Sequence, residues 1–422
     1  MSLPPEAETK AGIECYATTG APCPAKLRVF DEDFRVEEVL KRVGVSREQF
    51  DGGFPLYKVE KRSIDTLHLE RALTSILGSR VSYAGIKDKR ALAVQYVSLT
   101  SSRVGSPELI ERQEFRCELV GYMRKPLSRS MIAGNRFRIL LRDGCPELQK
   151  SIAEALETAR SGRLPNFYGL QRFGSRDNRT HRIGRALVRR SFEEAVRLLV
   201  FAPRPWDIGE AKAARELIST GRYEEGLRLL PRGEDVERMV AHRLSRKPED
   251  KLGAIRAVPI ALRRLYVHAF QSYIFNRSLS LAMREGLDIS KAIHGDNWGE
   301  LSSDGLSLKK VHGVREPMTA EAVPLLQLVG YAYRNYGSRF DGCVEKVLET
   351  EGVQPREFYV KEMQEVSAEG GFRRAHMSVR EASTGSEQSS AWLEFTLARG
   401  EYATVLLREV IKPQDPTSAG FD

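Results

Sequence analysis

The sequence predicts an α+β protein built on a mixed, mostly antiparallel sheet with flanking helices. Segments that favour β structure recur between residues 27 and 141, and another lies at residues 392–398. Between them, from about residue 192 to residue 358, apolar residues recur mostly at helical spacing. Strands and helices that are segregated along a chain in this way are typical of α+β folds. At 422 residues, the chain is long enough for two or more domains.

The first part of the chain reads as two strands followed by a helix. Residues 1–24 are punctuated by Pro and Gly, and we expect them to form a flexible lead-in. Residues 27–39 alternate like a strand toward their C-terminal end, and residues 54–61 form the next strand. Apolar residues then recur at helical spacing, and Asp65 or Thr66 is the candidate N-cap of this helix.

Further along, two short β-favouring segments flank a charged turn. The first contains Tyr83, the second covers residues 94–99, and a Lys-Asp-Lys-Arg turn at residues 87–90 separates them. The next expected elements are strands at residues 115–121 and 136–141 and a helix at residues 147–160.

The middle of the chain has a helical texture, and the end returns to β character. Ser191 with Glu194 resembles a capping box at the start of the helical part. Residues 383–390 are polar and are expected to form a loop before the strand at residues 392–398. The chain after residue 412 is expected to fray. Helices are expected at residues 209–218, 223–230, 259–285 and 400–409.

The charge balance of the chain favours a polyanionic partner. The formal net charge is +9 and the isoelectric point is near 9.2, whereas the hydrophobic and charged fractions, 41% and 29%, are ordinary for a globular protein. A basic excess of this size suggests nucleic acid. The same excess would also be explained by solubility alone.

The cysteines and histidines give no sign of a metal site. The seven histidines include no His-x-x-x-His pair, and neither phosphate-binding glycine motif occurs, so we expect no metal and no nucleotide cofactor. No signal peptide or apolar run of about 18 residues predicts a membrane segment. The cysteines are odd in number and widely spaced, which argues against a disulfide framework or a zinc site and favours reduced thiols in a cytoplasm. The cysteines are Cys15, Cys23, Cys117, Cys145 and Cys343.

The charged turn places one carboxylate, Asp88, among three cations. Nearby positive charge favours the ionised carboxylate and lowers its pKa. An ionised carboxylate held between two strands suits a nucleophile or a general base. The alternative interpretation is a solvated hairpin tip.

A second run, at residues 165–174, mixes aromatic residues with Asn, Gln and Arg. Such side chains can stack on a base and hydrogen-bond to its edge. The alternative interpretation is a set of buried aromatic residues beside a turn.

Arginines then recur every three to four residues with only Asp177 opposing them, so a helical part would carry them on one face. Such a stripe can follow a phosphate backbone, although it could also be a solvated helix face. Gly174 and Gly184 would interrupt a single continuous helix. The arginines are Arg172, Arg176, Arg179, Arg182, Arg185 and Arg189.

Two of these runs resemble signature motifs of the TruD family of pseudouridine synthases. The first is Ala-Gly-Ile-Lys-Asp-Lys at residues 84–89, and the second is Pro-Asn-Phe-Tyr-Gly-Leu-Gln-Arg-Phe-Gly at residues 165–174. The likeness extends over roughly residues 26–411. Weaker matches to family motifs lie at residues 28–39, 269–276, 295–296, 371–375 and 400–409.

The resemblance implies a discontinuous catalytic domain. It would comprise residues 25–190 and 371–412, interrupted by an inserted, largely helical TRUD domain at residues 191–370 and followed by a tail at residues 413–422. The long insert looks more like that of archaeal or eukaryotic members than that of bacterial ones.

The resemblance also implies the isomerisation of a uridine in RNA, most often uridine 13 of tRNA, by base flipping and without a cofactor. The family's catalytic Asp falls on Asp88. The family's basic residue before its Asp-Phe pair falls on Arg28, where many members have Lys, and Tyr168 stands where Phe is common. The implied substrate-binding residues are Arg28, Lys87, Asn166, Tyr168, Gln171 and Arg172, and the implied contacts to the RNA backbone are Arg176, Arg179, Arg182, Arg185 and Arg189.

Two other classes stay open at this point. One is an RNA-binding protein or chaperone of the same fold without turnover, against which the intact Asp88 and Asn166 argue. The other is a different RNA-modifying enzyme, such as a methyltransferase, which would need a glycine-rich cofactor motif that we do not find. We expect a cytoplasmic protein with tRNA as its partner; the oligomeric state stays open, and we favour a monomer.

Overall fold

A computed structural model describes residues 3–41, 43–85, 87, 91–101, 106–174, 177–202, 204, 206–313 and 322–421. Its main feature is a ten-stranded sheet in which β1 pairs with β5 in parallel and the other described pairs are antiparallel. This confirms the α+β class and the mostly antiparallel sheet. The strands are β13 (Arg380–Glu387), β14 (Ser390–Ala398), β8 (Ile132–Leu141), β1 (Phe34–Leu40), β5 (Leu92–Leu99), β3 (Phe54–Lys61), β7 (Phe115–Met123) and β2 (Val45–Ser46) in spatial order, with β4 (Val81–Tyr83) on β5 and β6 (Leu109–Glu111) on β7.

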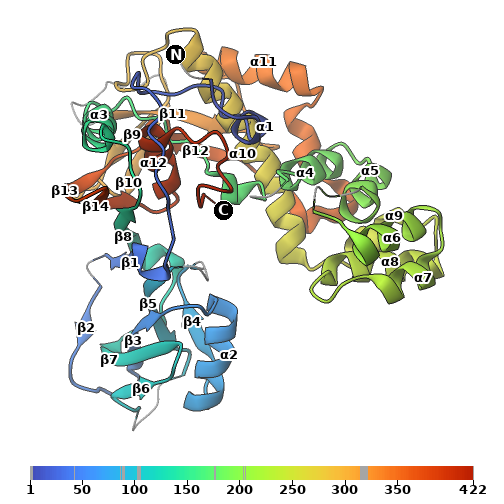
Figure 1. The fold of residues 1–422 in the computed structure, drawn as a ribbon, viewed down its shortest axis with the longest axis horizontal. Coiled ribbons are helices and arrows are strands. Elements are labelled where there is room, and N and C mark those ends of the chain that lie inside the picture. Colours follow the sequence, from blue (N-terminus) through green and yellow to red (C-terminus); the bar gives the residue numbers. More distant parts are fainter. Residues whose placement is uncertain are drawn as a thin grey trace.

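Figure 1 shows how these strands and the other elements are arranged in space. In Figure 1 the lower lobe holds β1–β7 and α2, the upper part holds α3, α12 and a second sheet, and the helices α4–α9 form a separate lobe beside α10. The helices are α1 (Glu6–Lys10), α2 (Thr66–Leu77), α3 (Leu148–Arg160), α4 (Thr180–Val188), α5 (Phe192–Val196), α6 (Gly209–Ser219), α7 (Tyr223–Leu229), α8 (Asp235–Arg246), α9 (Lys251–Arg256), α10 (Ile260–Arg284), α11 (Asp341–Glu351) and α12 (Ala403–Ile411).

A second sheet accompanies the many helices of the stretch up to residue 358, and the sequence had not predicted it. It has the order β10 (Leu308–His312), β9 (Trp298–Leu301), β11 (Ala322–Leu328) and β12 (Gly371–Arg374). Its core strand β11 is buried over five consecutive residues, so it lacks the alternation that identifies a half-buried strand. Its partner β12 lies more than 40 residues later, so local sequence gave no sign of the pairing.

Local signals predicted α2 well and two other elements badly. The Asp65 side chain accepts hydrogen bonds from the amides of Leu67 and His68, as expected of an N-cap. Ser191 makes no capping hydrogen bond among the described residues, so the predicted capping box is wrong. The polar residues 383–390 were expected to be a loop, but most of them belong to the β13–β14 hairpin, because polar side chains suit a solvent-exposed edge strand.

Gly184 lies inside α4 and does not interrupt it, which corrects the expectation from sequence. A Cβ atom at Gly184 would lie 1.9 Å from the carbonyl oxygen of Tyr266 in α10. The missing side chain therefore lets the two helix backbones come close together. Helix propensity alone predicted a break, but tertiary packing overrides it.

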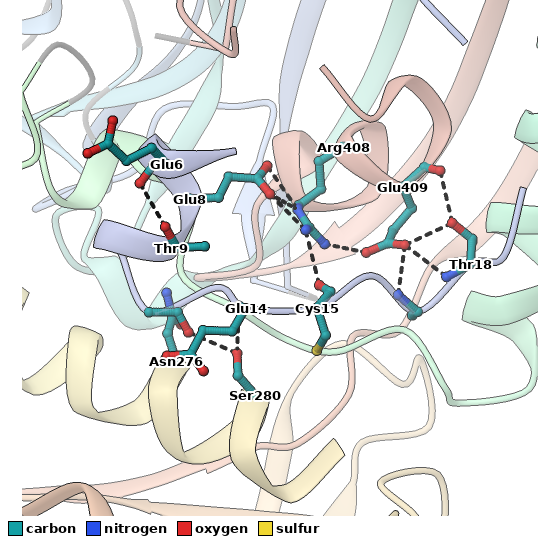
Figure 2. Close-up of polar contacts among 12 residues, drawn as sticks. Glu6, Glu8, Thr9, Glu14, Cys15, Thr18, Asn276, Ser280, Arg408 and Glu409 are labelled. Atoms are coloured by element: carbon teal, nitrogen blue, oxygen red, sulfur yellow. Dashed lines mark hydrogen bonds and ion pairs between the residues drawn. The ribbon is translucent and has the colours of Figure 1, made fainter. Parts of the chain in front are cut away.

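Both ends of the described chain pack onto the core, unlike the flexible lead-in and frayed tail that the sequence suggested. Glu8 in α1 is buried and pairs with Arg408 of α12 at 2.8 Å, and Arg408 also pairs with Glu409 (Figure 2). Glu409 accepts hydrogen bonds from the amide and hydroxyl of Thr18. Near the other end, Phe421 is buried. A buried arginine needs paired carboxylates, and the N-terminal segment supplies one of them.

Cys23 and Cys145 form a disulfide, which corrects the expectation of reduced thiols throughout. Lys26 and Arg142 form an isolated antiparallel β-bridge. Cys23 lies three residues before Lys26 and Cys145 three residues after Arg142, so the antiparallel register places the two cysteines opposite each other. The wide sequence separation hid this pairing.

No helix within the described ranges combines the length and the apolar character that a membrane crossing requires.

Candidate active site

A pocket of about 210 Å³ lies where strands β1 and β8 meet the N-terminal end of α12. It brings together three residues that the sequence singled out far apart in the chain: Arg28, Lys87 and Gln171. The other lining residues are Phe34, Val36, Asn135, Phe137, Glu401, Tyr402, Ala403 and Thr404.

Lys87 enters this pocket from the charged turn between β4 and β5. Its ammonium lies 3.0 Å from the Oε1 atom of Glu38 and donates to the Oδ1 atom of Asn135 at 2.8 Å. Its backbone amide donates to the Thr66 hydroxyl at 2.9 Å. The Lys61 ammonium donates to the Lys87 carbonyl at 3.4 Å. These contacts fix the start of the turn on four different elements, β1, β8, α2 and β3.

Asp88, the predicted catalytic residue, follows Lys87 directly and lies outside the described residues. Because Lys87 lines the pocket, the chain enters the turn at the pocket wall. The strands on either side of the turn are those predicted from sequence, since β4 and β5 pair in antiparallel register from Val81 and Leu99 inward.

Arg28 forms another part of the wall. Its side chain is 95% buried, its guanidinium lies 4.2 Å from the centre of the Phe34 ring, and it donates to the carbonyl of Gly420 at 3.5 Å. Its φ of 53° falls in the left-handed region. A non-glycine residue there is held against an intrinsic preference, and such residues concentrate at functional sites.

The side-chain amide of Gln171 makes two hydrogen bonds that hold it in place. Its Nε2 atom donates to the carbonyl of Phe421 at 3.1 Å, and its Oε1 atom accepts from the Thr404 hydroxyl at 3.3 Å. Gly169 makes this arrangement possible, because a Cβ atom there would lie 2.7 Å from the Gln171 Oε1 atom and 2.9 Å from the Tyr402 ring.

Asn166 and Tyr168 adjoin the pocket without being among its lining residues. The Tyr168 ring makes an edge contact with the ring of Tyr402, with 6.0 Å between centroids. The Asn166 Oδ1 atom accepts a hydrogen bond from Arg373 at 2.6 Å, and the same guanidinium lies 4.0 Å from the centre of the Tyr168 ring. The guanidinium of Arg172 lies 5.8 Å from the centre of the same ring.

The arginine stripe divides into paired and exposed members. Arg179 pairs with Asp177, and Arg185 pairs with Glu351 at 3.0 Å, so both guanidinium groups serve internal contacts. Arg182 and Arg189 are exposed; Arg182 lies in the first turn of α4 and Arg189 directly follows its last residue. Arg176 lies outside the described residues. Only exposed cations can reach a phosphate, so Arg182 and Arg189 remain the candidates in the described part of the stripe.

Several pocket residues were not predicted from the sequence. Asn135 and Phe137 occupy one face of β8, and alternation along that strand would have placed them together once its neighbours were known. Glu401 is buried and accepts from Arg374 at 2.6 Å. Tyr402 and Thr404 belong to the motif at residues 400–409, which the sequence predicted to form a helix.

The arrangement suits a planar polar ring attached to a phosphate backbone. Phe137 and Tyr402 offer aromatic faces, Gln171 and Asn135 offer amides, and Arg28 offers a cation. Aromatic stacking with edge hydrogen bonds is how proteins hold an extruded nucleobase. Among the described residues, no group of three His, Cys, Asp or Glu side chains could hold a metal ion. The fold and site define a base-modifying enzyme of the pseudouridine synthase class.

Comparison with known proteins gives the family. The model of the family "tRNA pseudouridine synthase D (TruD)" matches residues 10–410. The chain is 33% identical to the "Probable tRNA pseudouridine synthase D" of Methanosarcina acetivorans over 97% of each chain, and 35% identical to that of Pyrobaculum arsenaticum over the whole of both. A crystal structure of TruD from Methanosarcina mazei is 31% identical, has a TM-score of 0.80, and is matched over 99% of this chain and 100% of that one. The chain therefore belongs to the TruD family of pseudouridine synthases, as its two motifs predicted.

Proposed function

We propose that this protein converts a uridine of tRNA, at position 13, to pseudouridine, and that it acts as a monomer in the cytoplasm. The observation that carries the proposal is the position of Lys87 in the pocket wall, since the next residue is the carboxylate that the family motif assigns to catalysis. Family membership along nearly the whole chain supports the same reaction.

The pocket supplies the groups that the reaction needs. The target uridine leaves its stack, which costs a few kcal/mol that stacking and backbone contacts offset. Tyr402 and Phe137 stack on the uracil ring, Gln171 hydrogen-bonds to its edge, and the buried guanidinium of Arg28 supplies a positive charge at the pocket wall. Tyr168 supports this wall through its ring contact with Tyr402. Asn166 supports it by accepting a hydrogen bond from Arg373.

Asp88 then starts an isomerisation that needs no redox partner. The bond between C1′ and N1 breaks, the uracil turns within the pocket, and a bond from C1′ to C5 forms. The proton on C5 is lost and N1 gains one, so atoms and electrons balance. Asp88 acts either as a nucleophile or as the base that removes the C2′ proton.

The decisive experiment replaces Asp88 by Asn. We expect Asp88→Asn to form no pseudouridine in unmodified tRNA while it folds and binds tRNA like the wild type, because the change removes only the carboxylate charge. Asp51→Asn is the matched control, since Asp51 is an exposed aspartate on another turn of the same lobe. Pseudouridine is measured by chemical derivatisation and primer extension, and binding by filter retention.

Other outcomes of this experiment discriminate between the alternatives. Equal activity in Asp88→Asn and the wild type would remove Asp88 from the mechanism. Binding of tRNA without product in either protein would instead favour an RNA-binding role. A tRNA in which uridine 13 is replaced by cytidine tests the position, because it should then remain unmodified.

A further inference from the structure

Asn276 lies in the middle of α10 and binds the backbone of Tyr168 at both of its polar groups. Its Oδ1 atom accepts from the Tyr168 amide at 2.8 Å, and its Nδ2 atom donates to the Tyr168 carbonyl at 3.0 Å. The same Nδ2 atom donates to the carbonyl of Ala11 at 3.0 Å. The side chain is completely buried, so water cannot replace these contacts.

A primary amide is the side-chain group that can make this set of bonds. It offers one acceptor and two donors in a plane, whereas a carboxylate offers only acceptors and a hydroxyl only one donor. Tyr168 lies in an irregular segment, between the bridge at Pro165 and the turn Leu170–Arg172, where strand neighbours do not satisfy its backbone. Asn276 thus takes the place of a neighbouring strand for this one residue.

The same helix also sets the orientation of the Tyr168 ring. Phe275, the residue before Asn276, packs edge-on against that ring with 5.6 Å between centroids. The Tyr168 ring also makes an edge contact with the ring of Tyr402, which lines the pocket. A shift of the Tyr168 backbone would therefore move the aromatic wall of the pocket.

We propose that Asn276 is a positioning residue for pseudouridine formation, which acts by holding Tyr168 in register with the pocket and tying it to the N-terminal segment. The inference rests on the proposed function, in which Tyr168 supports the uracil-binding wall. It assigns a task to the run at residues 269–276, whose aromatic residues otherwise serve the core.

Ser280, one helical turn further along α10, provides a matched control. Its hydroxyl donates to the Gly12 carbonyl at 2.8 Å and accepts from the Glu14 amide at 3.0 Å (Figure 2). It is as buried as Asn276 and contacts the same N-terminal segment, but within the described part of the chain it makes no hydrogen bond to Tyr168. A purely structural role of α10 would make the two residues equivalent.

The test measures kcat, tRNA affinity and thermal unfolding for Asn276→Ala, Ser280→Ala, Tyr168→Ala and the double variant of Asn276 and Tyr168. Asn276→Ser is included in case Asn276→Ala does not fold. We expect Asn276→Ala to lower kcat by about 10- to 100-fold at unchanged tRNA affinity, the size of effect that a misplacement near 1 Å can cause. We expect Ser280→Ala to lower only the unfolding temperature. If Asn276 acts through Tyr168, the double variant is no slower than Tyr168→Ala.

Two results would overturn the inference. One is a loss of kcat in Asn276→Ala no larger than in Ser280→Ala. The other is a double variant whose loss equals the product of the two single losses, which would mean that the residues act independently. If Tyr168→Ala alone keeps wild-type kcat, the role of Tyr168 and this inference both fail, while the Asp88→Asn experiment still decides the reaction itself.

Discussion

The guanidinium of Arg373 lies 4.0 Å from the centre of the Tyr168 ring, although the two residues are about 200 positions apart in the chain. The same group donates to the Oδ1 atom of Asn166 at 2.6 Å and to the Asn166 carbonyl at 3.0 Å. Arg373 belongs to β12, the last strand of the second sheet along the chain. A strand that is distant in the chain thus holds together Asn166 and Tyr168, the two residues that the resemblance predicted to bind the substrate.

Arg373→Lys should lower kcat/KM even though the positive charge is kept. Lysine lacks the planar fork that binds Asn166 twice and lies over the ring of Tyr168. We expect a loss of about 1–3 kcal/mol in transition-state stabilisation, which is roughly 5- to 150-fold in kcat/KM. Arg380→Lys is the control, because Arg380 is exposed on the edge strand β13. Equal values for Arg373→Lys and the control would show that the contact with Asn166 and Tyr168 does not serve catalysis.

Replacing Arg182 and Arg189 together by Gln should lower the affinity for tRNA and make that affinity less sensitive to the salt concentration. Both residues are exposed, and each phosphate contact contributes about 0.9 to the slope of log affinity against log salt. We expect the slope to fall by up to about 2, with kcat at saturating tRNA unchanged. Arg197→Gln is the control, because Arg197 pairs with Glu194 on the same lobe. An unchanged slope would show that Arg182 and Arg189 do not contact the phosphates of the tRNA.

The stability of the fold should fall as the pH drops below about 6.5, in part through His181. Burial, helped by the charge of Arg182, lowers the pKa of His181 to about 3, and its ring stacks on Tyr273. The unfolded chain binds a proton near pH 6.5 that the folded chain does not take up, so the folded state loses about 1.4 kcal/mol per pH unit between those values. Denaturant unfolding of the wild type and His181→Phe at pH 7.5 and 5.0 measures this.

His181→Phe should keep the ring stacking and remove that part of the pH dependence. His242→Phe is the control, because His242 is exposed on α8 and should leave the dependence unchanged. If His181→Phe loses stability with falling pH as steeply as His242→Phe and the wild type, the prediction that His181 is neutral in the folded protein is wrong.

Reduction of the disulfide between Cys23 and Cys145 should destabilise the protein. The bridge closes a loop of more than 100 residues, and loss of such a bridge typically costs about 2–5 kcal/mol. Cys23→Ser should therefore lower the free energy of unfolding, and a reducing agent should lower that of the wild type to the same level without affecting the variant. Thiol titration of the unreduced, denatured protein should find the three free cysteines that the structure describes; five would contradict the bridge.

The sequence by itself determined the fold class, many element boundaries and the family. These properties are local: Asp65 caps α2 through amides two and three residues away, and the motifs at residues 84–89 and 165–174 carry their chemistry within short runs. Residues adjacent in the chain remain adjacent in the fold, so spacing alone could reveal them.

Tertiary structure alone decided how these runs combine. It set Arg373 over Tyr168, brought Tyr402 and Phe137 to the same pocket, and joined Cys23 to Cys145. It also placed Arg179 and Arg185 in ion pairs with carboxylates while leaving Arg182 exposed. Each of these outcomes depends on which distant segments pack together and in which register. A one-dimensional pattern gives the side chains of a segment but not the partner that will bury or pair them.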